Sequence, residues 1–332
     1  MIDLKLAHTF LDHLFDQLQN KNINIDSYEI DHLCYRTSSD ENYQVIKDAF
    51  SPLGECLIES EVNGRLIATY KLKNPILYKH WIIDLIEVPA PKQGKITQEG
   101  FEHIEVVIDC DFEELKESIL LNAPDISFEK KGLEKDLNPE LEIEFDQCAV
   151  KFHHKSLENI IAIEKNAVLM DFLDSSQILN KLKSYFPCIS GTLPLNIHTS
   201  QSDLDILFCA QDLAQFERDV TQLLQGRFDL QMKRTTKQGQ ETSITVFHTD
   251  HFKVELFAQN YSSFKQQANI HFLIEARLLK IFKEELRQRV KALKEEGHKT
   301  EPAFGMIFNL SSPYDDLIKL NKLSDLELSK LL

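Results

Sequence analysis

The sequence has 332 residues, of which 42% are hydrophobic and 27% are charged. This composition is typical of a globular protein and excludes a disordered, collagen-like or fibrous chain; the length fits two domains of roughly 150 residues each. Because 53 acidic side chains face only 37 basic ones, the net charge of −16 argues against general nucleic-acid binding through phosphate contacts.

The sequence also gives expectations about location. It contains no apolar run that approaches the roughly 18 residues needed to span a bilayer, and it begins without the charged and apolar regions of a secretory signal. Its cysteines are scattered and form no CxxC pair, which disfavours a disulfide framework or a zinc knuckle. We therefore expect a cytoplasmic protein with reduced thiols and no membrane partner. The six cysteines are Cys34, Cys56, Cys110, Cys148, Cys188 and Cys209.

The first half of the chain is predicted to begin with an amphipathic helix, because apolar residues recur at three- and four-residue spacing from Leu4 to Leu18. The pattern then changes to short elements around a turn signal at Asn63-Gly64. These are strands over 28–36, 56–62, 65–72 and 80–88 and a helix over 41–50. The order repeats further on, with a strand over 101–109, a helix over 111–121 and short strands that end at 148–153.

The second half is predicted to alternate helices and strands before it becomes helical. A helical segment starts at Ser156, and we place the domain boundary between Ile163 and Ser175, giving domains 1–167 and 168–332. A long helix over 269–296 closes at Gly297, and helices run from there to the C-terminus. The elements between are helices over 176–186 and 213–224 and strands over 203–209, 228–234, 242–249 and 252–257.

Histidines occupy equivalent positions in the repeated part of the first domain. The two halves align best with residues 30–33 against residues 101–104, which predicts two tandem βαβββ units and makes His32 and His103 symmetry mates. Sheets that close around a funnel would bring them together. The last strand of the first unit adds Asp84 or Glu87, and that of the second adds His153. Imidazoles with one carboxylate suit zinc, iron, nickel or manganese.

Residues 1 to about 165 resemble the YecM-like proteins, a branch of the vicinal-oxygen-chelate (glyoxalase-like) superfamily. The resemblance rests on DHLCYR at 31–36, NGR at 63–65, IEVP at 86–89, GFEHIE at 100–105 and VKFH at 150–153. It implies a paired βαβββ fold with a metal in the funnel, held by His32, Glu87, His103 and His153. Asp84 lies where many members of the superfamily have their glutamate, so the choice between Asp84 and Glu87 stays open. The two are three residues apart and cannot face the same side of a regular strand.

Acidic residues form a second constellation beside a glycine turn in the other half. The turn at Gly191-Thr192 has backbone amides that can approach an anion. Asp203 and Asp205 lie two apart on a predicted strand and so face the same side, and Glu255 supplies a third carboxylate. Like charges this close are costly unless a cation lies between them, which makes a Mg²⁺ site. Such a site suits in-line transfer at a phosphoryl group.

This arrangement resembles the nucleotidyltransferase superfamily of the polymerase-beta type, whose signature is Gly-Ser, a gap, Asp-x-Asp and a later acid. Threonine replaces the serine at position 192. Residues 170–332 further resemble an uncharacterised family of that superfamily through GTLPLNI, SDLDI, VELF, IEARLLK and HKTEPAF. The resemblance implies metal binding and catalysis by Asp203, Asp205 and Glu255, phosphate contacts at Gly191 and Thr192, and binding of triphosphate or acceptor by Arg277 and Lys299.

The sequence thus predicts an α+β protein with a paired βαβββ vicinal-oxygen-chelate-like domain, followed by a nucleotidyltransferase-like α/β domain with C-terminal helices. We expect a divalent transition metal in the first domain, Mg²⁺ with a nucleoside triphosphate in the second, and a small-molecule substrate. A non-catalytic nucleotide or small-molecule sensor is one alternative. The other is an N-terminal isomerase or dioxygenase-like enzyme with a degenerate C-terminal domain. The metal, the acceptor and the oligomeric state stay open.

Overall fold

The computed structural model describes residues 3–62, 64–92, 94 and 98–332. Within these ranges, no helix combines the length and the apolar character that crossing a bilayer requires. The chain folds as two compact units. The first consists of residues 1–108, 112–157 and 324–326, and the second of residues 109–111, 158–323 and 327–332. The main division thus follows residue 157, ten residues before the boundary expected from the sequence.

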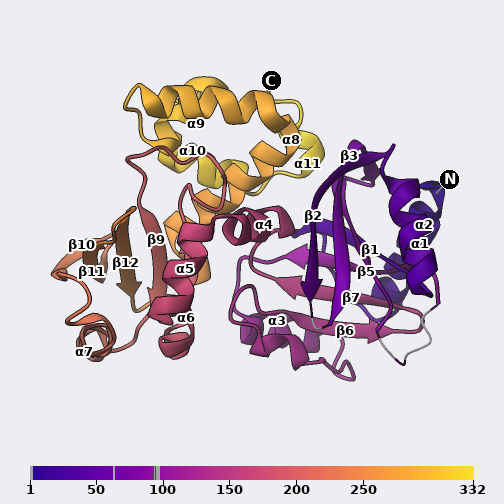
Figure 1. Ribbon diagram of the computed structural model, residues 1–332, viewed down its shortest axis with the longest axis horizontal. Helices are drawn as coiled ribbons and strands as arrows, with labels where there is room; N and C mark the ends of the chain where they lie inside the picture. Colours follow the sequence, from indigo (N-terminus) through magenta and orange to yellow (C-terminus); the bar gives the residue numbers. More distant parts are fainter. Residues whose placement is uncertain (1–2, 63, 93, 95–97) are drawn as a thin grey trace. The chain divides into compact units, whose positions relative to one another are not determined.

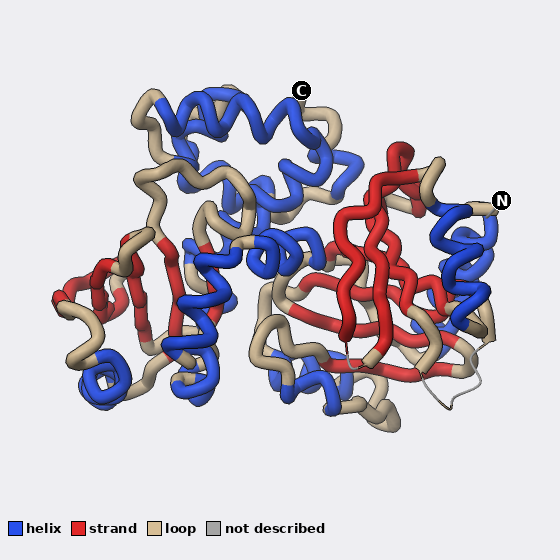
Figure 2. Tube along the Cα trace, in the orientation of Figure 1, coloured by secondary structure: helices blue, strands red, loops and turns tan. Residues whose placement is uncertain are grey.

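The first unit is built on a seven-stranded mixed sheet with the order β2-β3-β4-β1-β5-β7-β6 (Figure 1). Its strands are β1 (Glu29–Arg36), β2 (Gly54–Val62), β3 (Arg65–Tyr78), β4 (Trp81–Pro89), β5 (Gly100–Val107), β6 (Leu141–Phe145) and β7 (Cys148–His153). Its helices are α1 (Lys5–Asn20), α2 (Asp40–Phe50) and α3 (Phe112–Leu120), with a 3₁₀ turn at Lys131–Glu134. In the view of Figure 2, β2 and β3 run up the page while β6 and β7 run across it, so the sheet is strongly curled.

A pseudo-twofold axis relates the two halves of this sheet. β1 is parallel to β4 and β5 is parallel to β7, whereas β1 and β5 are antiparallel at the centre. His32 lies opposite Glu105, and Cys34 lies opposite His103. One register pair lies between these two pairs. A twofold rotation about an axis through it places His32 on His103 and Cys34 on Glu105. The tandem repeat and the equivalence of His32 and His103 are therefore properties of the fold.

The second repeat is a reduced copy of the first. Where the first repeat adds the outer strand β2 after its helix, the second has a single antiparallel bridge between Glu129 and Glu142 of β6. The described strands of the second repeat are thus β5, β6 and β7, with the bridge at the position of the fourth. The shortened edge leaves the centre of the sheet intact.

Local sequence signals explain most of these boundaries. The apolar stripe of α1 is buried and packs against β3 and β5. Ser39 caps α2 by accepting a hydrogen bond from the backbone N–H of Asn42 at 3.1 Å. β4 ends at Pro89, as the proline pattern predicts. The predicted turn at Asn63-Gly64 lies partly outside the described residues, and its neighbours Val62 and Arg65 are register partners.

The second unit contains a five-stranded sheet with the order β10-β11-β12-β9-β8, in which only β12 and β9 pair in parallel. Its strands are β8 (Cys188–Ser190), β9 (Leu204–Cys209), β10 (Gln231–Lys237), β11 (Gln240–His248) and β12 (Lys253–Gln259). The helices from this part of the chain onward are α4 (Leu157–Lys165), α5 (Ala167–Ser176), α6 (Ile178–Lys181), α7 (Leu213–Leu224), α8 (Gln267–Glu295), α9 (Thr300–Phe308), α10 (Pro313–Leu320) and α11 (Asp325–Leu328). Two 3₁₀ turns lie at Lys183–Tyr185 and Ser263–Lys265.

Two helices of this half depart from the sequence prediction. The single helix expected over 176–186 does not form, because α5 ends at Ser176, where Gln177 adopts a left-handed conformation (φ 54°) and its N–H bonds to the carbonyl of Leu173. Only short helical segments follow it. The long helix α8 is interrupted at Lys283, where φ is 56°. Apolar spacing continues across both positions, so periodicity alone does not mark either break.

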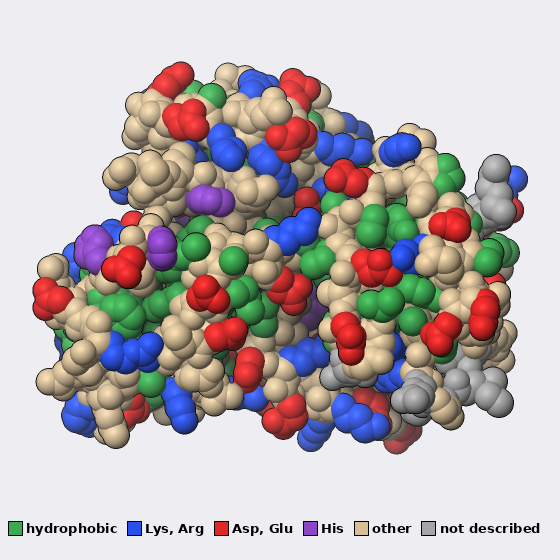
Figure 3. Space-filling model, in the orientation of Figure 1, with side chains coloured by type: hydrophobic (Ala, Val, Ile, Leu, Met, Phe, Trp, Pro, Cys, Tyr) green, Lys and Arg blue, Asp and Glu red, His purple; other side chains and the backbone are tan. Residues whose placement is uncertain are grey.

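Charged side chains of both signs are interspersed on the face drawn in Figure 3. Acidic and basic side chains are mixed over most of this face and do not gather into one broad field. The face drawn in Figure 3 therefore shows, among the described residues, no broad basic surface of the kind that binds a nucleic-acid backbone.

Candidate functional site

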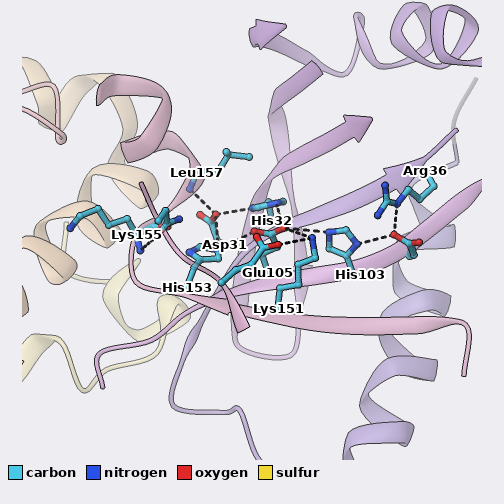
Figure 4. Close-up of polar contacts among 12 residues, drawn as sticks. Asp31, His32, Arg36, His103, Glu105, Lys151, His153, Lys155 and Leu157 are labelled. Carbon is cyan, nitrogen blue, oxygen red and sulfur yellow. Dashed lines mark hydrogen bonds and ion pairs between the residues drawn. The ribbon is translucent and has the colours of Figure 1, made fainter. Parts of the chain in front are cut away.

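Three buried histidines surround one carboxylate at the centre of the seven-stranded sheet (Figure 4). Oε1 of Glu105 lies 3.6 Å from Nε2 of His32 and 3.4 Å from Nε2 of His103. Oε2 lies 3.5 Å from Nε2 of His153, and the ammonium of Lys151 lies 3.3 Å from Oε1. These five residues come from β1, β5 and β7, and we call them the histidine–carboxylate cluster. Each histidine is only 1% exposed.

The preceding acidic residue orients each of two cluster histidines. Nδ1 of His32 lies 2.8 Å from Oδ2 of Asp31, and Nδ1 of His103 lies 3.0 Å from Oε2 of Glu102. With Nδ1 engaged by a carboxylate, Nε2 of each ring is left to point toward Glu105. Histidine ligands of protein metal sites are held in the same way, through the nitrogen that does not bind the metal. The repeated acid–histidine dipeptide therefore builds two similarly oriented imidazoles.

The orienting carboxylates are themselves anchored. The backbone N–H of Leu157 donates to Oδ2 of Asp31 at 2.8 Å, and the Arg36 guanidinium donates to Glu102. Burial would raise the pKa of Glu102, but the hydrogen bond from His103 and the charge of Arg36 lower it to about 2. Both carboxylates are thus held in the ionised form that accepts a hydrogen bond from imidazole.

Electrostatics within the cluster favour positive charge beside Glu105. Burial would lower the pKa of His32, but Glu105 and Asp31 outweigh it and raise that pKa well above its ordinary value. Burial likewise opposes the rise of the His103 pKa, which reaches about 10 under the influence of Cys34 and Glu102. The pKa of His153 is lowered, mainly by burial. Burial would raise the Glu105 pKa, but Lys151 and the histidines hold it well below the usual range.

The donor set fits a divalent first-row metal. Among the described residues, Nε2 of all three cluster histidines is buried and makes no hydrogen bond. Buried polar atoms normally have a partner, so three such nitrogens around one carboxylate are an exception that requires an explanation. Imidazole nitrogen and carboxylate oxygen are the ligands that zinc, iron, nickel and manganese accept. A cation bound beside these rings would supply the missing partner of each nitrogen that it contacts.

The residues expected from the sequence to bind metal fall into overlapping groups. In each group the ligand atoms lie within 4.8 Å of one another. The three groups are His32 with Glu87 and Glu105, His103 with Glu87 and Cys34, and His153 with Asp31 and His32. Glu87, one of the two candidates on β4, thus accompanies both symmetry-related histidines.

Asp84, the alternative to Glu87, belongs to none of the three groups found among the described residues. It is buried, and its Oδ2 lies 3.7 Å from Nζ of Lys71. The sheet register also shows that Lys151, and not His153, occupies the position equivalent to Glu87, because Cys34 pairs with Glu87 as Glu105 pairs with Lys151. Cys34, Glu105 and Lys151 are therefore members of the site that the sequence analysis did not assign.

The acidic residues of the second unit gather at the edge where β9 and β12 begin. Asp205 and Glu255 are direct register partners on these parallel strands. Burial, followed by the charges of Glu255 and Asp203, raises the pKa of Asp205 to about 7. Asp203 pairs with Lys253, whose Nζ lies 2.5 Å from its Oδ2. Within the described chain, the three acids do not form a group with the 4.8 Å spacing found in the first unit.

Gly191 lies against the Asp205 carboxylate. Its φ is +76°, and a Cβ atom added to it would lie 2.3 Å from Oδ2 of Asp205. Glycine is required here for both reasons, because an L side chain is strained at this φ and would collide with the acid. Thr192, which follows, is buried. The turn therefore brings backbone directly beside the Asp205 carboxylate.

The two cationic residues expected from the sequence, Arg277 and Lys299, lie in different surroundings. Arg277 donates to the backbone carbonyls of Asn321 and Leu323, at 3.1 and 2.7 Å, and so ties down the chain after α10. Lys299 is exposed at the start of α9. Lys294 was not singled out in the sequence; its pKa is lowered mainly by burial, against the charges of Glu275 and Glu301 and, more weakly, of Asp205 and Asp203. Its Nζ donates to Oγ1 of Thr300 at 3.0 Å.

Comparison with known proteins finds a relative for the first half of the chain. Residues 4–164 match the sequence profile of the YecM protein family. Protein YecM of Escherichia coli (strain K12) is 33% identical over 167 residues, which are 47% of this chain and 89% of the relative. An uncharacterised protein of Haemophilus influenzae is 34% identical over 106 residues, 32% of this chain and 54% of that protein.

The second half matches a family without an assigned function. Residues 171–320 match the profile of a domain of unknown function, DUF4269. Solved structures similar to parts of this chain include the structural-genomics protein EC4020, which has a YecM-like fold, at 30% identity and a TM-score of 0.42 over 47% of this chain and 87% of that one. They also include the Cid1 poly(U) polymerase, at 13% identity and a TM-score of 0.31 over 44% of this chain and 48% of that one.

Proposed function

The chain belongs to the YecM family through its N-terminal half, and we propose, from the geometry of the site, that this half binds a divalent first-row metal ion in the histidine–carboxylate cluster. The observation that carries the proposal is that three buried imidazole Nε2 atoms converge on Glu105 at 3.4–3.6 Å, while none of them makes a hydrogen bond within the described chain. His32, His103 and His153 supply nitrogen, and Glu87 and Glu105 supply oxygen. Zinc, iron, nickel and manganese are the candidates.

When bound, such an ion acts as a Lewis acid toward a small ligand with two neighbouring oxygen atoms, or serves binding alone. The protein's own part is to hold the imidazoles by Asp31 and Glu102, so that little reorganisation accompanies binding. Once Glu105 binds the ion, the ammonium of Lys151 would pair with an anionic oxygen of the ligand in place of Glu105. Glu87, Glu105 and Lys151 are partly exposed, so they mark the side from which an ion would enter.

Calorimetric titration of the metal-free full-length protein with zinc, nickel or manganese tests this function. The double variant His32→Ala/His103→Ala should lose binding, whereas His13→Ala, an exposed histidine of the same unit, should bind as the wild type does. Equal binding by the double variant, in a form that retains the wild-type circular dichroism spectrum, would contradict the proposal.

For the C-terminal half we propose binding of a nucleoside triphosphate with Mg²⁺ and transfer of its nucleotidyl group to a hydroxyl or phosphate acceptor. Its support is Asp205 beside the glycine turn: burial, followed by the charges of its register partner Glu255 and of Asp203, raises the pKa of Asp205 to about 7, and a cation would relieve that repulsion. Lys253 must release Asp203 before that acid can reach the ion. A bound phosphate would offer the freed ammonium a new partner.

In this proposal, Asp203, Asp205 and Glu255 hold Mg²⁺, and one of the three assists deprotonation of the acceptor. Gly191 and Thr192 contact phosphate through the turn. Arg277 and Lys299 remain candidates for triphosphate or acceptor binding. Lys294 joins them, because Asp203 and Asp205 already act on its charge.

Titration with ATP and Mg²⁺ tests the nucleotide site. Asp205→Asn should abolish binding, and Asp250→Asn, an exposed acid of the same unit, should leave it unchanged. Pyrophosphate release in the presence of an acceptor would mark a transferase, and binding without release under any acceptor would favour a nucleotide sensor. Undiminished nucleotide binding by Asp205→Asn would contradict both the transferase and the nucleotide sensor.

A further inference from the structure

Cys34 occupies the middle of a row of potential ligands that crosses three strands. It is the register partner of Glu87 on β4 and of His103 on β5. Register partners project to the same face of a sheet, so the thiol lies between a carboxylate and an imidazole. The ligand atoms of these three residues lie within 4.8 Å of one another, and Cys34 is fully buried.

The pseudo-twofold axis supplies an internal comparison for this row. Its counterpart runs through His32, Glu105 and Lys151 on β1, β5 and β7. In that counterpart the ammonium of Lys151 lies 3.3 Å from Glu105 and neutralises it. The row of Cys34 has a carboxylate in place of the ammonium, so all three of its members are Lewis bases once the thiol is deprotonated. The two halves of the cluster are thus equivalent in position but not in chemistry.

His103 adds a second, independent sign of a missing ligand. Its ring is 1% exposed, Glu102 holds Nδ1 at 3.0 Å, and Nε2 makes no hydrogen bond in the part of the chain that the structure describes. A buried imidazole fixed through one nitrogen and unsatisfied at the other is the arrangement found in protein metal sites. The unsatisfied nitrogen belongs to the residue that pairs directly with Cys34.

We infer that the Cys34 thiolate is a further ligand of the proposed ion and joins His103 and Glu87 in binding it. The inference rests on the proposed metal-binding function of the first unit and specifies its ligand chemistry. On binding, the thiol gives up its proton to solvent and its sulfur donates to the ion. A ligand set of sulfur, nitrogen and oxygen favours zinc or cobalt over manganese, which prefers oxygen ligands.

Titration of the metal-free full-length protein with Co²⁺ tests the inference. Visible ligand-field bands report bound cobalt, and a near-ultraviolet sulfur-to-cobalt charge-transfer band reports a thiolate ligand. Wild type should show both. Cys34→Ser should keep visible bands, lose the charge-transfer band and bind cobalt more weakly, by roughly tenfold or more. Cys56→Ser, which alters an exposed cysteine of the same unit, should match the wild type.

The outcomes separate the inference from the function on which it rests. Wild-type protein without visible bands would overturn metal binding as such. Visible bands without charge transfer, or charge transfer that persists in Cys34→Ser, would overturn the thiolate ligand alone. Should Cys34→Ser fail to fold, X-ray absorption of zinc-loaded wild type decides: a sulfur neighbour at ~2.3 Å together with imidazole supports the inference, and a shell of nitrogen and oxygen only overturns it.

Discussion

His32 and Glu105 are register partners across the two central strands of the first sheet, and Nε2 of the histidine lies 3.6 Å from Oε1 of the carboxylate. The same oxygen lies 3.4 Å from Nε2 of His103. One carboxylate therefore serves two imidazoles that the pseudo-twofold axis relates. The arrangement is electrostatically stable with protons on the rings, and it is equally suited to a cation that replaces them.

Replacing Lys151 with methionine is expected to raise the affinity for a divalent metal by roughly tenfold. The ammonium lies 3.3 Å from Glu105, so it competes for that carboxylate and repels an incoming cation. Calorimetric titration of the metal-free variant measures the change. Lys131→Met, which removes an exposed lysine of the same unit, should leave the affinity unaltered. Unchanged or weaker binding by a folded Lys151→Met would show that the lysine does not oppose the ion.

Metal binding is expected to release protons and to strengthen with pH. The pKa of His103 is raised to about 10 and that of His32 well above its ordinary value, so both rings carry a proton at neutral pH in the metal-free protein. A metal binds only the neutral ring, and rising pH removes the competing proton. The apparent affinity should therefore increase from neutral pH toward about 10. Titrations in buffers of different ionisation enthalpy measure the protons released, and a pH-independent affinity would contradict this assignment.

Gly191→Ala is expected to destabilise the protein more than Gly239→Ala. Both glycines have a φ of +76°, which costs an L residue about 1–2 kcal/mol. A Cβ at position 191 would also lie 2.3 Å from Oδ2 of Asp205, whereas a Cβ at 239 meets nothing within 4 Å among the described atoms. Denaturant unfolding of the two variants isolates the cost of this close approach. Equal losses would mean that Asp205 moves aside without penalty.

Glu275→Gln is expected to stabilise the protein at neutral pH and much less in acid. Burial raises the pKa of Glu275 well above 4.5, with Glu301 adding to the shift, and its Oε1 makes no hydrogen bond within the described chain. The folded state thus keeps a proton that the unfolded state loses, and wild-type stability falls as pH rises from about 4.5 toward the folded pKa. Glutamine does not titrate, so its thermal midpoint should exceed the wild-type value by an increasing margin as pH rises above about 4.5.

The control for this prediction is Glu295→Gln, an exposed position on the same helix. It should follow the wild-type midpoint at every pH. A Glu275→Gln variant that is less stable than the wild type at neutral pH would show instead that the carboxylate is ionised and paired in the folded protein.

The paired repeat of the first unit could be predicted because each half carries an acid–histidine dipeptide on an apolar strand. That pattern located His32 and His103 and made them equivalent, as the register of β1 and β5 confirms. The match of Glu87 with His153 rested on similar sequence intervals alone. Strand pairing depends on bulges and loop lengths, and the register shift within β3 and β4 shows how intervals mislead. Lys151 could have been found two residues before His153, on the same strand face.

In the second unit, local sequence spacing could be recognised, but contacts between residues far apart in the sequence could not. The Asp-x-Asp pair and the glycine turn were visible because their spacing is local. The pairing of Asp203 with Lys253 depends on the parallel register between β9 and β12, which joins residues 50 apart in sequence. Lys294 stands on α8, beyond an interruption that apolar periodicity does not mark. Its proximity to the acids is a tertiary property.

Elemental analysis of full-length protein purified without an affinity tag, in parallel with His32→Ala/His103→Ala, tests the central claim most directly. The metal-binding account predicts a stoichiometric amount of one first-row divalent metal in the wild type and its loss from the folded double variant. A wild type that retains no metal after loading and dialysis, or a double variant with the same metal content, would contradict it.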